Sequence, residues 1–200
     1  LSVDILHPFL NTIWEQERIP SDWQQGRIIK LPKRGDLSEC NNWRGIMLLS
    51  VASKILCRII LERTAKELER KLRDNQAGFR PNRSCSDQIA TLRIIIEQSL
   101  EFNSQLYMVF IDFEKAFDSV DRNMLWAVLA HYGVPRKLID IIKLFYQRFQ
   151  AQVVNDGDLS EPFYMNTGVR QDCLLSPMLF LVALDWVMRE TTQEGNTGIQ

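Results

Sequence analysis

The feature that most constrains how this chain can fold is a short apolar run, residues 106–111, that ends in an acidic side chain, Asp112. An apolar run of this length is typical of a strand buried in a sheet. A carboxylate at the end of a buried strand is costly for the fold unless a cation compensates for its charge. Mg²⁺ suits this position, because it prefers a few hard carboxylate oxygens together with phosphate and water. The run therefore predicts a buried strand over residues 105–112 that delivers a metal-binding carboxylate.

Two further acidic residues follow this run, although acidic residues after an apolar run are a weak signal when taken alone. Asp118 and Asp121 could each be a turn residue or a helix cap and nothing more. For Asp121 we favour the cap, because a helical pattern follows it to about Tyr132.

The rest of the chain mixes helical patterns with a few strand candidates. Ser50 is placed to cap one helix, and the stretch of residues 155–158, NDGD, predicts a hairpin turn. No internal repeat or low-complexity linker divides the chain, and the mixture indicates the α+β class. Helices are expected over 4–17, 51–73, 86–100, 121–132, 136–149 and 177–190, and strands over 25–31, 105–112, 150–155 and 162–168.

Composition excludes several classes of protein. At 46% hydrophobic residues the 200-residue chain can bury a core, but no apolar run is long enough to cross a bilayer, so we expect no membrane partner. The four cysteines form no C-x-x-C pair and do not cluster with the two histidines, which argues against a zinc site. Scattered cysteines fit reduced thiols in the nucleus or cytoplasm. The N-terminus lacks Met and a signal-type stretch, which suggests a piece of a longer polypeptide.

Charge is unevenly distributed along the chain. The formal net charge of −1 argues weakly against a nucleic-acid partner. Residues 18–83, however, hold fifteen Lys or Arg and seven Asp or Glu, a net charge of +8, and the remaining residues have a net charge of −9. This asymmetry predicts a basic surface for a polyanion and an acidic region that could hold cations. The alternative is two solvated faces of opposite sign.

Four blocks of the sequence resemble the reverse transcriptases of LINE-type, non-LTR retrotransposons. Residues 110–118, FIDFEKAFD, resemble motif A in the form F-x-D-x-x-K-A-F-D, and residues 167–180, TGVRQDCLLSPMLF, resemble motif B. Residues 76–84, QAGFRPNRS, are similar to the block that precedes motif A. Two short stretches, LPKRGD at 31–36 and NWRGI at 42–46, are similar to the fingers segment. One block alone is modest evidence, but the four occur in the family's order.

The resemblance implies an α+β fold of the right-hand polymerase type. Basic fingers would span residues 1–104 and part of a palm residues 105–200, with Asp112 on one strand of a small antiparallel sheet backed by helices. The implied activity is an RNA-directed DNA polymerase that uses an RNA template, a DNA primer, dNTPs and two Mg²⁺ ions. Such a domain is part of a longer polyprotein, in which an endonuclease domain can also occur.

The resemblance also implies roles at the metal ions and at the triphosphate. Asp112 would bind both Mg²⁺ ions, and the backbone carbonyl of Phe113 would support the second. Lys33 and Arg44 would clamp the incoming triphosphate, since a guanidinium fork suits phosphate oxygens. Lys115 would lie near the triphosphate, although a solvated lysine is the simpler interpretation.

Further roles concern the sugar, the base and the nucleic-acid strands. Phe117 would lie under the sugar and exclude a 2′-hydroxyl, although composition alone favours an ordinary core aromatic. Gln171 would line the nucleotide and template pocket. Arg80, Arg83 and Arg170 are candidate contacts to template or primer phosphates.

Two departures from the family pattern predict weak or absent activity. Motif B normally has a glycine after its glutamine, and here Asp172 adds bulk and negative charge beside a polyanionic substrate. Motif C, [FY]-A-D-D, is absent; the nearest candidate, Asp185, lies inside a helical pattern, and the thumb is absent too. We therefore expect this piece to be inactive alone. The alternatives are a degenerate or domesticated remnant that binds nucleic acid, and a helical protein-interaction module.

Overall fold

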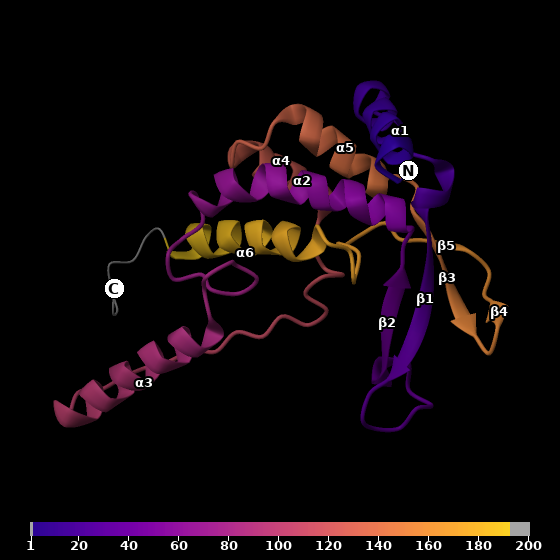
Figure 1. The fold of residues 1–200 in the computed structure, drawn as a ribbon. Helices are drawn as coiled ribbons and strands as arrows, with labels where there is room; N and C mark the ends of the chain where they lie inside the picture. Colours follow the sequence, from indigo (N-terminus) through magenta and orange to yellow (C-terminus); the bar gives the residue numbers. More distant parts are fainter. Residues whose placement is uncertain (1, 193–200) are drawn as a thin grey trace.

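Helices are the main secondary structure of the computed structural model, which describes residues 2–192 (Figure 1). The mixture of helices and strands predicted from the sequence is confirmed. No helix in this described range combines the length and the apolar character needed to span a membrane. The helices are α1 (Ser2–Gln16), α2 (Val51–Glu69), α3 (Cys85–Glu101), α4 (Arg122–His131), α5 (Arg136–Tyr146) and α6 (Ser176–Thr192), with 3-10 turns η1 (Ser21–Gln24) and η2 (Cys40–Asn42). The strands are β1 (Gln25–Pro32), β2 (Trp43–Leu48), β3 (Gln150–Asn155), β4 (Asp158–Leu159) and β5 (Phe163–Tyr164).

The five strands form one mixed sheet, which corrects the expected antiparallel sheet. β1 pairs antiparallel with β2 but parallel with β3, and β3 pairs antiparallel with both β4 and β5. The parallel pair is possible because α2 to α5 lie between β1 and β3 in the chain and provide the long crossover that parallel strands need. The predicted hairpin turn is confirmed, since Asp156 and Gly157 both have positive φ between β3 and β4.

The strand expected over residues 105–112 is wrong. These residues are extended but belong to no strand, and Val109 and Phe110 are 86% and 78% exposed. The apolar run supplies side chains for a sheet, but a strand also needs a neighbour to pair its backbone groups. Within residues 2–192, the strands β1 to β5 pair only with one another and not with this run. Asp112 is exposed.

The main core lies between α2, α4, α5 and α6, which stack beside one another in Figure 1. Ile60, Leu129, Ile142 and Val182, one from each of these helices, are fully buried. Each such side chain contributes about 1.5–3 kcal/mol by leaving water. The capping predictions are confirmed: the Ser50 hydroxyl accepts a hydrogen bond from the Ser53 amide, and the Asp121 carboxylate caps α4.

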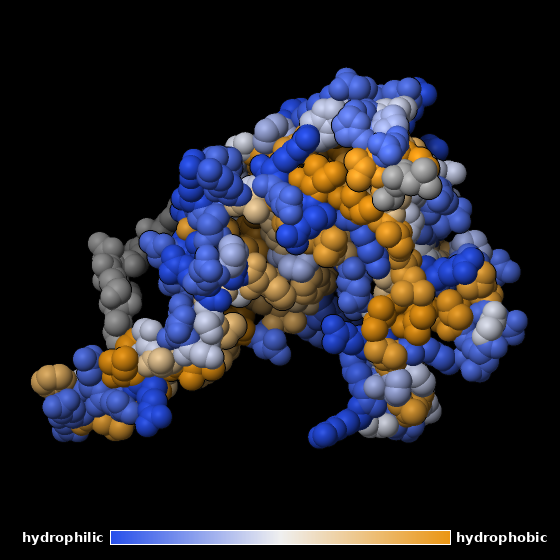
Figure 2. Space-filling view, viewed as in Figure 1, coloured by the Kyte–Doolittle hydropathy of each residue, from blue (hydrophilic) through white to orange (hydrophobic). Residues whose placement is uncertain are grey.

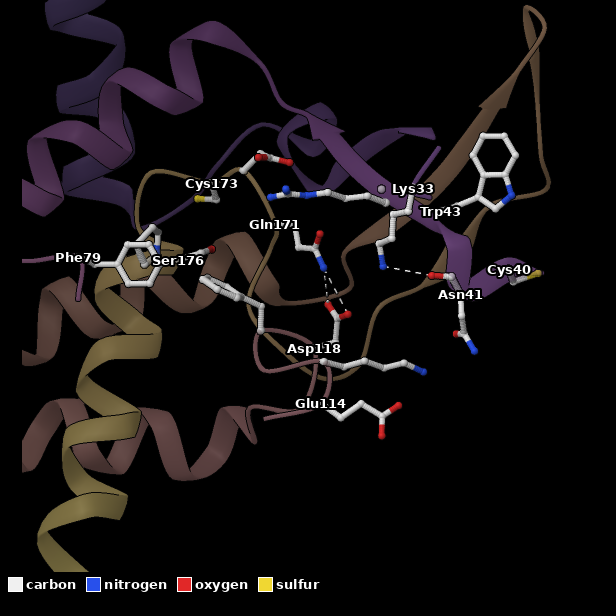
Figure 3. A pocket seen from close by; sticks show the side chains of 16 residues that line it. Lys33, Cys40, Asn41, Trp43, Phe79, Glu114, Asp118, Gln171, Cys173 and Ser176 are labelled. Carbon is white, nitrogen blue, oxygen red and sulfur yellow. Dashed lines mark hydrogen bonds between the residues drawn. The ribbon is translucent and has the colours of Figure 1, made fainter. Parts of the chain in front are cut away.

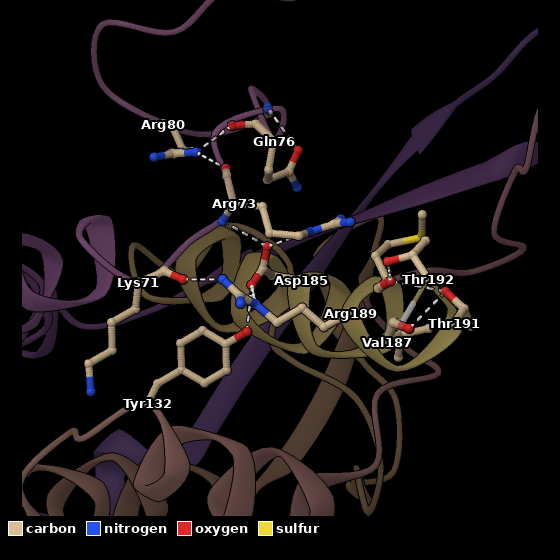
Figure 4. Close-up of polar contacts among 12 residues, drawn as sticks. Lys71, Arg73, Gln76, Arg80, Tyr132, Asp185, Val187, Arg189, Thr191 and Thr192 are labelled. Atoms are coloured by element: carbon tan, nitrogen blue, oxygen red, sulfur yellow. Dashed lines mark hydrogen bonds and ion pairs between the residues drawn. The ribbon is translucent and has the colours of Figure 1, made fainter. Parts of the chain in front are cut away.

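A buried carboxylate on α6 ties the end of α2 to the core (Figure 4). Asp185 is fully buried and accepts hydrogen bonds from the Tyr132 hydroxyl, from Nε of Arg189, and from both the amide and Nε of Arg73. Burial alone raises the pKa of Asp185, but the bonds from Arg189, Tyr132 and Arg73 together hold it below its ordinary value. The Arg73 amide bonds to this carboxylate, which explains why α2 ends at Glu69 and not at the predicted residue 73.

The arm, which we define as residues 85–113, has few contacts with this core. α3 has no buried residue, and Figure 1 shows it extending away from the other helices, with the following segment returning as extended chain. Apolar side chains are visible on its surface in Figure 2; Ile89 and Leu100, for example, are 68% and 76% exposed. The arm therefore receives little stabilisation from burial within the described residues.

Candidate functional site

Side chains from distant parts of the sequence line one large open pocket (Figure 3). Its volume is about 970 Å³, near the upper end of the range of small-molecule sites, about 300–1,000 Å³. The pocket lies between the β1–β2 hairpin, the turn of motif A and the loop of motif B. Its lining residues are Lys33, Cys40, Asn41, Trp43, Arg44, Gly45, Phe79, Glu114, Lys115, Phe117, Asp118, Gln171, Asp172, Cys173, Ser176 and Pro177.

The β1–β2 hairpin supplies the basic wall of the pocket. Lys33 follows β1 directly and Arg44 lies on β2, opposite Leu31 in the antiparallel register. The ammonium group of Lys33 donates to the carbonyl of Asn41 at 3.1 Å, while Arg44 is exposed. The hairpin therefore places two cations on the pocket wall; the resemblance implies that they clamp a triphosphate.

The motif A turn forms the opposite wall and brings Lys115 and Phe117 into the pocket. Phe117 is half-buried and stacks on Phe180 of α6, with ring centres 5.0 Å apart. The ring of Phe79 contacts the Phe117 ring edge-on, with ring centres 6.2 Å apart. Because Phe117 is held on two sides, its ring is a fixed surface of the pocket.

Motif B is locked against motif A through backbone contacts. The amide of Gly168 donates to the carbonyl of Val120, and the amide of Val169 donates to that of Phe117 at 2.7 Å. A Cβ at Gly168 would lie only 2.6 Å from Cα of Asp118, so this position requires glycine. The close approach fixes the distance between the two motifs.

Arg122, the first residue of α4, donates hydrogen bonds to the segment that leads into motif B and to the first residues of that motif. Its guanidinium donates to the carbonyls of Met165, Thr167 and Gly168 at 2.7–2.8 Å, and to that of Tyr146 at 3.3 Å. Burial lowers the pKa of this guanidinium. No local sequence pattern indicates this role, because the four carbonyls lie more than 20 residues away along the chain.

Three residues that line the pocket have strained backbone conformations. Phe79, Lys115 and Asp172 have φ values of +57°, +51° and +65°, in the left-handed region that favours glycine. The value for Asp172 is notable, because the family has glycine at this position of motif B. The positive φ is therefore a conformational reason for the family to have glycine here, in addition to the steric and charge reasons expected from the sequence.

The five side chains predicted to bind the nucleotide are brought together, but the predicted metal ligand is not among them. Lys33, Arg44, Lys115, Phe117 and Gln171 all line the pocket. Asp112 lies outside this lining, and Phe113 borders a separate apolar groove between α4 and α6. No group of three or more His, Cys, Asp or Glu residues in the described part of the chain is arranged to hold a metal ion.

Two of the three predicted phosphate contacts have guanidinium groups that are buried in the described structure. Arg80 is 7% exposed and donates to the Glu69 carboxylate and to the carbonyls of Arg73 and Gln76. Arg170 is 1% exposed. The third candidate, Arg83, is 40% exposed on the surface and pairs with Asp74.

Arg170 lies behind the pocket, among aromatic rings and a pair of thiols. Its guanidinium is 3.7 Å from the ring centre of Phe149, and its Nε and Nη2 atoms have no hydrogen-bond partner in the described structure. Burial lowers the pKa of Arg170 to about 10. The free thiols of Cys57 and Cys173 form a hydrogen bond in which Cys57 is the donor, and this bond lowers the pKa of Cys173 and raises that of Cys57. Arg170 therefore supports the motif B loop from inside.

Sequence reasoning missed several lining residues, of which Asp118 is the most informative. Nε2 of Gln171 donates to both carboxylate oxygens of Asp118 at 3.4 Å. Considered alone, Asp118 fits a turn residue or a cap, and its place in motif A is the available signal for a role in the pocket. Trp43, Asn41 and Glu114 also line the pocket. Trp43 and Glu114 lie within the NWRGI block and motif A, whereas no sequence pattern separates Asn41 from surface residues.

Comparisons with known proteins all find reverse transcriptases or proteins of transposable elements. Residues 31–199 match the protein family described as "Reverse transcriptase (RNA-dependent DNA polymerase)". The chain is 28% identical over 179 residues to the "Transposon TX1 uncharacterized 149 kDa protein" of Xenopus laevis, across 90% of the chain and 14% of that protein.

Two Drosophila melanogaster proteins are also similar. Identity is 27% over 190 residues to the "Retrovirus-related Pol polyprotein from type-2 retrotransposable element R2DM", across 95% of the chain and 18% of that protein. Identity is 31% over 181 residues to the "Probable RNA-directed DNA polymerase from transposon BS", across 86% of the chain and 19% of that protein. The chain spans less than a fifth of the length of each of these three relatives.

Proposed function

The chain belongs to the reverse transcriptase family of non-LTR retrotransposons, and on this premise we propose that it forms the nucleotide-binding part of an RNA-directed DNA polymerase. One observation carries the proposal. The five side chains expected around an incoming nucleotide come from four separate segments and line a single pocket: Lys33, Arg44, Lys115, Phe117 and Gln171. Its substrates would be dNTPs, an RNA template and a DNA primer.

The distribution of charge in the pocket supports a triphosphate ligand. Lys33 and Arg44 from the β1–β2 hairpin and Lys115 from the motif A turn all line the pocket, so two separate segments supply its cations. Phosphate oxygens are bound well by such groups, and a guanidinium can bind two oxygens at once. Phe117 offers a fixed aromatic surface for the sugar, where a 2′-hydroxyl would collide with the ring. Arg83 remains a candidate for a backbone phosphate of the template or primer.

We further propose that residues 1–104 are the fingers and residues 105–200 part of the palm. The basic β1–β2 hairpin, with Lys33 and Arg44, is suited to the fingers role, and the motif A turn and motif B loop are suited to the palm role. Residues 193–200 lie outside the described range. Relatives of the chain have names such as "Pol polyprotein", and we propose that this domain likewise functions within a longer polyprotein.

Reverse transcriptases generally depend on divalent metal ions. Asp112 and the Phe113 carbonyl offer the hard oxygen atoms that Mg²⁺ prefers. Two ions, however, need several carboxylate oxygens, and residues 2–192 contain no cluster of three candidate ligands. The described residues alone do not fit a two-ion site, so we assign Asp112 as one proposed ligand and derive no step of the reaction through the metal.

Nucleotide binding by the chain itself tests the proposal. In a titration with fluorescent N-methylanthraniloyl-dATP, Lys33→Ala and Arg44→Ala should each raise Kd about tenfold, the equivalent of one charge-assisted hydrogen bond. Arg34→Ala and Arg27→Ala are matched controls, since both are exposed cations on the same hairpin outside the pocket. Equal weakening by the controls would indicate non-specific attraction and contradict the proposed pocket.

A further inference from the structure

Motif A and motif B are joined in the pocket by one side-chain contact. Nε2 of Gln171 lies 3.4 Å from both Oδ1 and Oδ2 of Asp118, and both side chains are half-buried (Figure 3). An amide has a donor end and an acceptor end, whereas a carboxylate only accepts. The contact therefore selects one of the two orientations of the Gln171 amide, with its nitrogen toward Asp118 and its oxygen turned away.

The Asp118 carboxylate can select this orientation because its own backbone is fixed. The Asp118 amide donates to the carbonyl of Lys115 at 2.8 Å, which closes the motif A turn. Gly168 of motif B packs directly on the Asp118 backbone, where a Cβ would lie 2.6–2.7 Å from its Cα and carbonyl oxygen. The two partners of the contact thus belong to loops that cannot separate without breaking several backbone contacts.

We propose that Asp118 is a positioning residue that directs the amide oxygen of Gln171 into the pocket, where it accepts a hydrogen bond from the bound nucleotide. The inference rests on the proposed nucleotide pocket and sharpens it. A ligand group that meets this oxygen must be a donor, which for a nucleotide is a sugar hydroxyl or a base amino group. Without Asp118, the amide could rotate and present its nitrogen to the ligand, which would place donor against donor.

Exchange of the two functional groups tests this role. In Asp118→Asn the pair loses its charge, and in Gln171→Glu two carboxylates face each other. The double variant Asp118→Asn/Gln171→Glu has the same total charge as the natural pair. In it, the Asn amide donates to one oxygen of Glu, and the other oxygen still offers an acceptor to the pocket. A direct and independent role for each residue predicts no such restoration.

The main measurement is the KM for dTTP in primer extension on poly(rA)·oligo(dT) by the natural protein that contains this chain. Each single variant should raise KM about tenfold and change kcat less than about twofold, since the lost interaction is made in the bound state. The double variant should return to within about threefold of the natural KM. If KM in the double variant instead rises by the product of the two single-variant increases, the proposal is overturned.

An NMR measurement on the 200-residue chain separates this inference from the proposed function. The side-chain NH₂ signals of Gln171, identified by their loss in Gln171→Glu, should shift in Asp118→Asn. Asn166→Asp is a control, since Asn166 is exposed and outside the pocket. Unchanged Gln171 signals in Asp118→Asn would refute the contact even if nucleotides bind. A natural protein that extends no primer would instead refute the proposed function, and the NMR result would still decide the orientation.

Discussion

Motif B and motif A supply facing walls of the same pocket, but their supports differ. The motif B loop leads into α6, and Val169, Arg170 and Leu175 within it are at most 1% exposed. In the apolar run that leads into motif A, residues 107–111 are exposed and Leu106 is half-buried. A helix satisfies its own backbone hydrogen bonds, whereas a strand depends on a neighbour. The proposed nucleotide-binding side of the site is therefore preorganised by packing, whereas the segment that carries Asp112 has no strand partner among the described residues.

The largest expected effect tests whether Arg122 holds the motif B side in place. Arg122→Ala removes the donor to four backbone carbonyls and should lower the free energy of unfolding by about 3–4 kcal/mol, because unsatisfied part-buried acceptors are costly. Urea denaturation followed by circular dichroism measures the loss. The control is Arg136→Ala, at the equivalent first position of α5, where an exposed ion pair with Asp140 is worth at most about 0.5 kcal/mol. Similar losses in both variants would contradict the role of Arg122.

A substitution that adds one methyl group to Gly168 tests the contact between motif A and motif B. Gly168→Ala places a Cβ 2.6–2.7 Å from backbone atoms of Asp118 and Phe117, at a φ of +74°. We expect a loss of about 2–3 kcal/mol from steric overlap and backbone strain. Gly157→Ala has a positive φ of +96° but open space around the added carbon, so it isolates the strain alone, about 1 kcal/mol. If the two variants unfold at the same urea concentration, the motifs are not in close contact.

The features predicted correctly from the sequence are those with a local cause. The Ser50 and Asp121 caps and the turn at Asp156 depend on residues within a few positions, and the structure confirms them. The five pocket residues are predicted from their positions in the family motifs. These positions indicate which residues lie close together in the fold, and local sequence patterns do not. Their proposed roles remain predictions.

The features that the sequence does not predict share a different cause, which is contact between residues distant in the sequence. The run ending at Asp112 has strand composition, but its state depends on a partner strand. Arg80 and Arg170 have the charge of phosphate ligands, and only the folded chain shows that Glu69 and the ring of Phe149 bury them. The parallel pairing of β1 with β3 likewise depends on how the intervening helices pack.

A smaller effect is expected at the departure from motif B. Asp172→Gly removes a side chain at a φ of +65°, and should raise the free energy of unfolding by about 1 kcal/mol. It should also tighten binding of a labelled dNTP by the chain, because a negative charge leaves the pocket. Asp156→Gly, in the β3–β4 turn at a φ of +52°, should stabilise the chain similarly without any change in nucleotide binding. If both variants bind nucleotide equally, the charge at Asp172 has no influence on the site.

The smallest effect is expected on the motif A side. Val109 is 86% exposed, so Val109→Ser should change the free energy of unfolding by less than about 0.5 kcal/mol. The same substitution at Val128 of α4, which is 3% exposed, should cost about 2–3 kcal/mol because it leaves a cavity and buries a hydroxyl. Urea denaturation of the two variants measures both losses in the free energy of unfolding, so they can be compared directly. A loss above about 1 kcal/mol at Val109 would show that the run before Asp112 is packed in the folded chain, and the contrast between the two motifs would then disappear.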